Sequence, residues 1–199
     1  MQALHVAGSR KVAAISMFTA LAVVTDYAML PLANVKLMDS IVFVASLTFG
    51  LEVGVSVGAL SWLVYGEVNP LGPDGGLLVL ILIGSETVYA GLGCLVRRSF
   101  NYDEIGIPTM SLLWGSFGLI GAFAYDLITN IVPPLVSGTS LNAALFFLVP
   151  GAPFMVAHEV SDFVFFATVA PLLYAAICKV ARRQVGVVQP RPHLLDSNP

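Results

Sequence analysis

The sequence predicts an all-α integral membrane protein with six transmembrane helices. Of its 199 residues, 57% are hydrophobic and 11% are charged, whereas a soluble domain carries about 25% charged residues. Apolar runs long enough to cross about 30 Å of hydrocarbon recur along the chain and leave no room for a separate soluble domain. We expect a single transmembrane domain over residues 1–183 and a flexible cytosolic tail over 184–199, where helical periodicity ends and three prolines occur.

Six apolar segments are the expected spans. The first is interpreted as a retained helix, because no convincing small-residue cleavage site follows it. A short apolar segment at 140–149 is set off by Pro150 and Pro153. The expected spans are 12–31, 40–51, 53–67, 76–97, 108–133 and 152–180.

Basic residues decide how residues 40–66 are divided. Lys and Arg cluster at 10–11, 97–98 and 179–183, and the positive-inside rule places such clusters in the cytosol. One helix over 40–66 would put the second cluster outside, whereas two short helices put all three inside. We therefore predict a hairpin with Glu52 in a short cytosolic turn, both termini cytosolic, and close packing through glycines at 50, 54 and 58.

Polar residues concentrate in the outer half of the expected bundle. An ionisable group near the bilayer centre costs about 2.5–3.5 kcal/mol, so it usually faces a protein interior or a water-filled cavity. The cytosolic halves of the same helices carry almost no charge, which favours an outward-facing cup over a channel or a proton-driven carrier. The expected binding residues are Asn34, Lys36, Asp39, Glu67, Glu86, Tyr89, Asp126, Asn130, His158, Glu159 and Asp162.

The stretch "AYDLITN" at 124–130 lies on a face of small and polar residues. Positions 115, 118, 122, 126, 129 and 130 share that face at helical spacing and read Gly, Gly, Ala, Asp, Thr and Asn. The opposite face is bulky. Asp126 and Asn130 either line a binding site or form an interhelical hydrogen-bond pair that only holds the bundle together.

The stretch "HEVSD" at 158–162 has three interpretations. His158 and Asp162 share a helix side and lie near Glu159, which suits a binding site. They could bind a divalent cation, but the second His of an HExxH signature is missing, so we expect no metal and no cofactor. A buried His–carboxylate pair without a ligand is the third interpretation.

Other candidates have plain structural alternatives. Lys36 and Asp39 form either part of the site or a local ion pair that holds the first outer loop. Trp62, Tyr65 and Tyr89 are more often core or interfacial residues than stacking platforms. No Walker motif occurs in the chain, so it does not hydrolyse ATP by itself.

Three segments together resemble the substrate-binding S components of energy-coupling factor (ECF) transporters. They are "PLANVKLMDSIVFVASLTFGLEVGVSVGALSWLVYG" at 31–66, "AYDLITNI" at 124–131 and "GAPFMVAHEVSDFVFFATVAPLL" at 151–173. The resemblance implies a six-helix protein of the cell membrane that captures a vitamin or similar micronutrient from outside. It also implies a lid from loops 31–39, 67–75 and 133–141.

The same resemblance implies partners. S components associate with a membrane-embedded T component and two cytosolic ABC ATPases. The family's AxxxA contact for the T component has its nearest match here in Ser16 and Ala20. Nothing in the sequence indicates nucleic acid as a partner.

We expect solute capture and no enzymatic activity. Carboxylates outnumber cations among the outer polar residues, which predicts a ligand that is cationic or rich in hydrogen-bond donors. A stand-alone secondary transporter is the first alternative. A small intramembrane enzyme that uses His158, Glu159 and Asp162 is the second, although the chain offers no complete catalytic signature.

Overall fold

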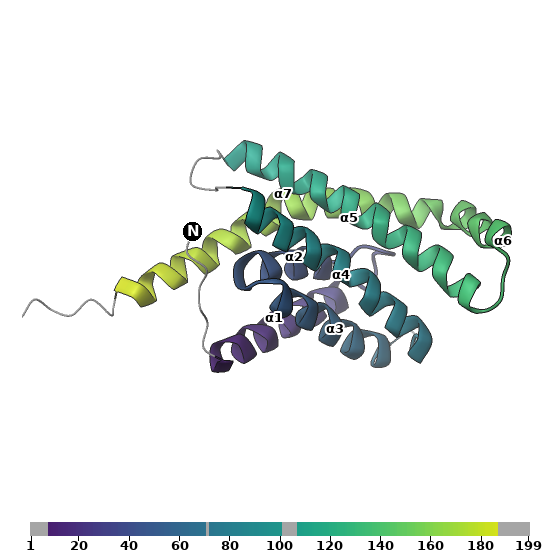
Figure 1. Ribbon diagram of the computed structural model, residues 1–199, viewed down its shortest axis with the longest axis horizontal. Coiled ribbons are helices and arrows are strands. Elements are labelled where there is room, and N and C mark those ends of the chain that lie inside the picture. The colour runs from purple at the N-terminus through teal and green to yellow at the C-terminus, as the bar shows by residue number, and fades with distance from the viewer. Residues whose placement is uncertain (1–7, 71, 101–106, 187–199) are drawn as a thin grey trace, which may run out of the picture.

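The computed structural model describes residues 8–70, 72–100 and 107–186, and 87% of these residues are helical with no strand among them (Figure 1). This part of the chain confirms the all-α prediction. Its elements in order are α1 (Gly8–Met29), α2 (Met38–Phe49), α3 (Leu51–Glu67), α4 (Gly76–Ser99), α5 (Ile107–Val136), α6 (Leu141–Phe146) and α7 (Leu148–Gly186).

Four helices have the length and composition needed to cross a membrane. They are α1, α4, α5 over Pro108–Val136, and α7 over Leu148–Val180. Only 17% to 39% of the residues in their most apolar windows are buried inside the protein, so much apolar surface is left uncovered. A soluble monomer rarely exposes such surface, and the chain is therefore a multi-pass membrane protein.

Residues 40–66 are divided into two helices, as the sequence predicted. The chain breaks at Gly50, whose φ of +102° is a conformation that glycine adopts without a side-chain clash. The predicted position of Glu52 is wrong by a small margin, because the break precedes it and places it in the first turn of α3. There Glu52 accepts a hydrogen bond from Lys11 of α1.

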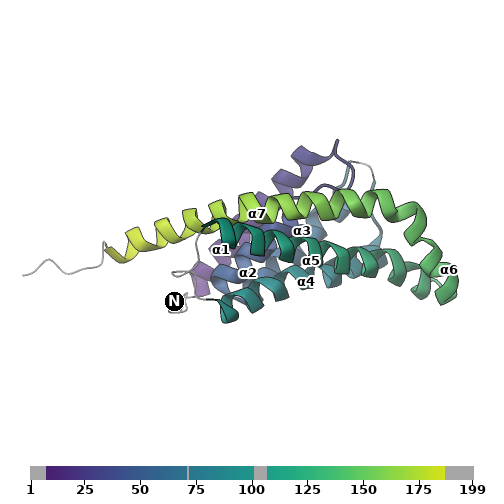
Figure 2. The same ribbon diagram turned by 90° about the horizontal axis from the view of Figure 1, so that it is seen from above.

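The short helix α2 is the centre of the bundle. It packs against α1, α3, α4 and α7, and Figure 2 shows it enclosed by these longer elements. With 12 residues it extends about 18 Å, which is less than the hydrocarbon thickness. Its side chains are buried at all but one position, so α2 is covered by protein and not by lipid.

The prolines near residue 150 do not separate two elements as expected. Helix α7 begins at Leu148 and runs through Pro150 and Pro153, and α5 likewise continues through Pro133 and Pro134. Pro150 lies in the first turn of α7, where a backbone N–H has no helical acceptor, whereas Pro153 lies beyond that turn and Pro133 and Pro134 lie near the end of α5. The short segment expected at 140–149 is therefore α6 followed by the start of α7. The tail boundary at 183 falls within α7, and residues 187–199 lie outside the described residues.

Small residues bring α5 against α7 along the predicted face. A Cβ on Gly118 would lie 2.7 Å from the carbonyl oxygen of Asp162, and one on Gly115 would lie 3.0 Å from that of Phe163. On the opposite face, Ile120 and Phe123 are about half exposed. The close approach places the polar residues of α7 beside those of α5.

Lys11 of α1 and Arg97 of α4 lie at one end of the bundle. Lys11 pairs with Glu52, and the guanidinium of Arg97 lies beside Gly50 at the α2–α3 break. Segment 30–37, which connects α1 to α2, lies at the other end because the intervening helices run antiparallel, and so do residues 68–70 and 72–75 between α3 and α4 (Figure 1). The polar residues of the predicted site surround this second end.

Candidate functional site

A cavity of about 450 Å³ opens at the end of the bundle opposite Lys11 and Arg97. Its walls come from segments 30–37 and 68–75 and from helices α2, α3, α4, α5 and α7. Six of the predicted binding residues line it together: Asn34, Lys36, Asp39, Asp126, Asn130 and His158. The expected lid segment 133–141 contributes none of the lining residues among the part of the chain described.

Five predicted residues do not line the cavity. Glu86, Tyr89 and Asp162 are buried directly behind its wall. Glu67 is exposed at the end of α3, and Glu159 is only partly buried on another side of α7. The side chain of Glu159 follows that of His158 by one position and therefore points about 100° away from it around the helix.

Aromatic residues that the sequence left as core are part of the wall. Trp62 and Tyr65 of α3 and Tyr125 of α5 line the cavity, with Trp62 and Tyr125 stacked at a ring separation of 6.4 Å. Their position at the polar end of their helices was the one available signal. The other lining residues that sequence reasoning missed are Ala33, Asn69, Asp74, Leu78, Leu82, Thr129, Gly151, Phe154 and Met155.

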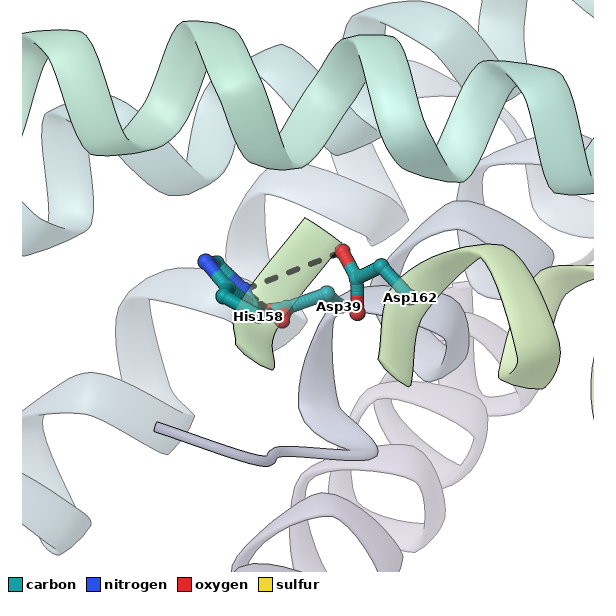
Figure 3. A group of neighbouring side chains, drawn as sticks. All are labelled: Asp39, His158 and Asp162. Atoms are coloured by element: carbon teal, nitrogen blue, oxygen red, sulfur yellow. Dashed lines mark hydrogen bonds and ion pairs between the residues drawn. The ribbon is translucent and has the colours of Figure 1, made fainter. Parts of the chain in front are cut away.

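His158 is the centre of the polar wall. Its Nδ1 lies 3.0 Å from Oδ1 of Asp126, and its Nε2 lies 2.9 Å from Oδ2 of Asp39. The imidazole is 2% exposed and the two carboxylates 3% and 1%. Figure 3 shows that Asp39 and Asp162 reach the histidine from the same side. Three helices, α2, α5 and α7, therefore meet at one ring.

A second layer of polar contacts supports the first. Tyr89 donates a hydrogen bond of 2.7 Å to Oδ2 of Asp162, and this oxygen lies 3.7 Å from Nε2 of His158. The indole of Trp62 donates to Oε2 of Glu86 at 3.0 Å. Glu86 and Asp162 thus place carboxyl groups close to the cavity without lining it.

Lys36 extends into the cavity over aromatic rings. Its ammonium lies 3.7 Å from the centre of the Trp62 ring and 4.6 Å from that of Tyr65, which is a cation–π arrangement. Oδ2 of Asp39 contacts His158 and not Lys36. This oxygen therefore does not form the predicted local ion pair with Lys36. Burial lowers the pKa of Lys36 below its ordinary value, and nearby carboxylates partly oppose the shift.

Other polar residues have local structural roles. Oδ1 of Asp26 accepts hydrogen bonds from the backbone N–H groups of Leu37 and Met38, which satisfies the first turn of α2. Asn34 adopts a left-handed φ of +59° and donates to the carbonyl of Phe154 at 2.9 Å. That bond ties segment 30–37 to α7.

Asn130 uses its amide within α5. Its Nδ2 donates to the carbonyl of Asp126 at 2.8 Å, and its Oδ1 lies beside Gly151, where a Cβ would come within 2.8 Å. Asp126 and Asn130 therefore have different roles. Asp126 bonds to another helix, whereas Asn130 fills space at the α5–α7 contact and lines the cavity.

Comparison with known proteins does not assign the chain to a group: no protein-family model, curated protein or solved structure matches it. The resemblance to ECF S components therefore stays a prediction. The structure itself defines the class as a multi-pass helical membrane protein with an acidic, aromatic-walled cavity at one end.

Proposed function

We propose that the chain captures a small cationic solute from outside the cell and acts as the S component of an ECF transporter. The observation that carries this proposal is the cavity, which gathers six polar residues predicted from distant parts of the sequence. A volume of about 450 Å³ falls within the range of about 300–1,000 Å³ that small-molecule sites occupy. The ligand class is a vitamin or a micronutrient of similar size.

The placement of charge supports an outward-facing cavity. The Lys11–Glu52 pair and Arg97 lie at the end opposite the cavity, and the positive-inside rule assigns that end to the cytosol. In this orientation both termini are cytosolic, and the α2–α3 hairpin is counted as two of six crossings, with the short α2 reaching the cytosolic end inside the bundle. The membrane is the cell membrane.

The walls favour a cation with an aromatic part. Asp39, Asp74 and Asp126 line the cavity, with Glu86 and Asp162 behind it, and among the described lining residues the basic side chains are Lys36 and His158. The ammonium of Lys36 already lies on the Trp62 ring, so this ring face accepts a positive charge. A cationic heteroaromatic solute would use the same ring and the same carboxylates.

The first helix supports a contact with a membrane partner. Ser16 and Ala20 are exposed on one side of α1, and Met17 beside them is 57% exposed. Small residues allow two membrane helices to approach closely. This surface is the proposed contact with the T component, which in turn binds two cytosolic ABC ATPases.

Ligand capture can be tested with the intrinsic fluorescence of the protein. The chain has two tryptophans, so Trp114→Phe leaves Trp62 in the cavity wall as the reporter. We expect thiamine, as a cationic heteroaromatic probe, or a ligand found by native mass spectrometry of the purified protein, to quench this signal. The anionic vitamin pantothenate should not. Tight binding of pantothenate with no binding of a cation would contradict the charge argument.

The partner requirement needs a transport assay. Uptake of the bound solute into liposomes should require the T component and ATP-hydrolysing ATPases. Ser16→Leu and Ala20→Leu should reduce uptake while leaving ligand binding unchanged. Gly84→Leu in α4, an exposed position where nothing lies within 4 Å of a Cβ, is the matched small-to-large control and should leave uptake unchanged. Uptake without any ATPase would instead identify a stand-alone secondary transporter.

A further inference from the structure

Asp39, His158 and Asp162 place three potential metal-ligand atoms within 4.8 Å of one another (Figure 3). We propose that these residues bind one divalent transition-metal ion at the base of the cavity. The inference does not depend on the proposed transport function. It concerns a site that the local sequence pattern did not predict, because Asp39 is 119 positions from His158.

The spacing of the donor atoms suits a metal. Nε2 of His158 lies 2.9 Å from Oδ2 of Asp39 and 3.7 Å from Oδ2 of Asp162. Ligands about 2.1 Å from a tetrahedral zinc ion are about 3.4 Å apart. The two distances at Nε2 of His158 differ from this spacing by about half an ångström or less, and all three donor atoms lie within 4.8 Å of one another. The hydroxyl of Tyr89, 3.4 Å from Nε2, or water from the cavity would complete the coordination.

The histidine is already held as it is in metal sites. Its Nδ1 faces Oδ1 of Asp126 at 3.0 Å, so a proton on Nδ1 leaves Nε2 free to coordinate. A carboxylate that accepts the second imidazole proton orients a metal-bound histidine and raises its basicity. Asp126 is therefore a positioning residue for the metal, and His158, Asp39 and Asp162 are the ligands.

An unsatisfied oxygen independently indicates a missing cation. Asp162 is fully buried and its carboxylate points at His158 (Figure 3), yet its Oδ1 has no hydrogen-bond partner in the described part of the chain. Leaving a buried polar atom unpaired costs about 1–3 kcal/mol or more when it is charged. Oδ2 of the same carboxylate already accepts from Tyr89, so an ion that Asp162 coordinates through both oxygens would satisfy Oδ1.

The balance of charge supports the same conclusion. Three carboxylates surround His158, those of Asp39, Asp126 and Asp162. With all three ionised and the imidazole doubly protonated, the group would carry an excess of two negative charges, which is costly in a buried site. A divalent ion in place of the Nε2 proton neutralises Asp39 and Asp162 and leaves the Nδ1–H bond to Asp126 intact.

The ion has a route to the site. Asp39 and His158 line the cavity, while Asp162 and Tyr89 lie directly behind them. One imidazole and two carboxylates suit Zn²⁺, Co²⁺ or Mn²⁺ better than Ca²⁺, which prefers six to eight oxygen ligands. The class of ion is therefore a first-row transition metal.

Cobalt provides a direct spectroscopic test on the full-length protein in detergent. After removal of metals with EDTA, titration with Co²⁺ should produce visible d–d absorption that saturates at one ion per chain and disappears when Zn²⁺ is added. Asp162→Asn and Asp39→Asn should each abolish the absorption. Asp126→Asn should weaken binding by about 10–100-fold, as loss of an outer hydrogen-bond partner does.

Controls separate the site from general acidity. Glu159→Gln removes a neighbouring carboxylate of α7 and should leave Co²⁺ binding unchanged, as should Glu67→Gln. Thermal unfolding confirms that each variant is folded, and His158→Gln provides a second test if an aspartate variant does not fold. Absence of saturable absorption in the folded wild-type protein, or equal binding by Asp162→Asn and Glu159→Gln, would overturn the proposal. Metal binding without solute uptake would retain it and reject the transport function.

Discussion

Nδ1 of His158 lies 3.0 Å from Oδ1 of Asp126, and this contact joins two otherwise apolar helices, α5 and α7, at the wall of the cavity. Both side chains are almost fully buried. Since α5 and α7 meet through small residues such as Gly118, the polar pair cannot separate without opening the helix interface. The site and the bundle share this interaction.

The Asp126–His158 contact should be more important for stability than Asn130. Asp126→Ala removes the hydrogen-bond partner of the buried Nδ1 of His158, which costs about 1–3 kcal/mol and more when the group is charged. Asn130→Ala removes a hydrogen bond within α5, worth about 1 kcal/mol. Thermal unfolding in detergent measures both variants. Equal destabilisation of the two variants would mean that the Asp126–His158 contact contributes no more to stability than the hydrogen bond of Asn130.

A variant of Asp126 that keeps its shape separates ligand binding from helix packing. If Asp126 also contacts the ligand, Asp126→Asn should weaken binding by about 1–3 kcal/mol. Unchanged ligand affinity together with a lower melting temperature would assign Asp126 to the helix interface alone.

The close packing of α5 against α7 should depend on the absence of a side chain at Gly118. A methyl group on Gly118 would lie 2.7 Å from both the carbonyl oxygen of Asp162 and the ring of Phe166. Gly118→Ala should therefore lower the free energy of unfolding by about 1–3 kcal/mol. Gly91→Ala in α4 is the matched control, because nothing lies within 4 Å of a Cβ there. That variant should be neutral or more stable by up to about 1 kcal/mol.

The position of segment 30–37 should depend on Asn34 in two separable ways. Asn34→Gly keeps the left-handed backbone and removes the bond to the carbonyl of Phe154, at a cost of about 0.5–1.5 kcal/mol. Asn34→Ala adds a left-handed penalty of about 1–2 kcal/mol. Hydrogen exchange at residues 30–37 should be faster in both variants, and fastest in the alanine variant. The reverse order would contradict this account of the loop.

Lys36 should make stability rise with pH in alkaline solution. Burial lowers the pKa of Lys36 in the folded protein, although Asp26, Asp39, Glu86 and Asp74 favour its charged form. Between this lowered pKa and the ordinary value of 10.5, the unfolded chain binds more protons than the folded chain, so stability increases as pH rises.

The measurement compares melting temperatures of the wild type and Lys36→Met from pH 8 to 10. The wild type should gain stability relative to the variant across this range, because the variant has no proton to lose at position 36. A difference that stays constant or falls with pH would show that the ammonium is not disfavoured in the cavity.

Much of the helical arrangement could be predicted from periodicity and charge. The break in residues 40–66 followed from requiring three basic clusters on one side, and Gly50 supplies it. The small-residue face of the fifth helix identified the side of α5 that meets α7. The boundaries expected near Pro150 and Pro153 were wrong, because α7 begins before both prolines and continues through them. Proline disfavours a helix interior but does not always end the helix.

The composition of the chain by itself determined a helical membrane protein with its polar residues near one end, since hydropathy and helical spacing act locally. Only the tertiary structure decided which of those residues meet. Asp39 reaches His158 because α2 is packed at the centre of the bundle, while Glu159, one position from His158, points elsewhere. Contacts between residues far apart in sequence depend on the packing of whole helices, which no local pattern encodes.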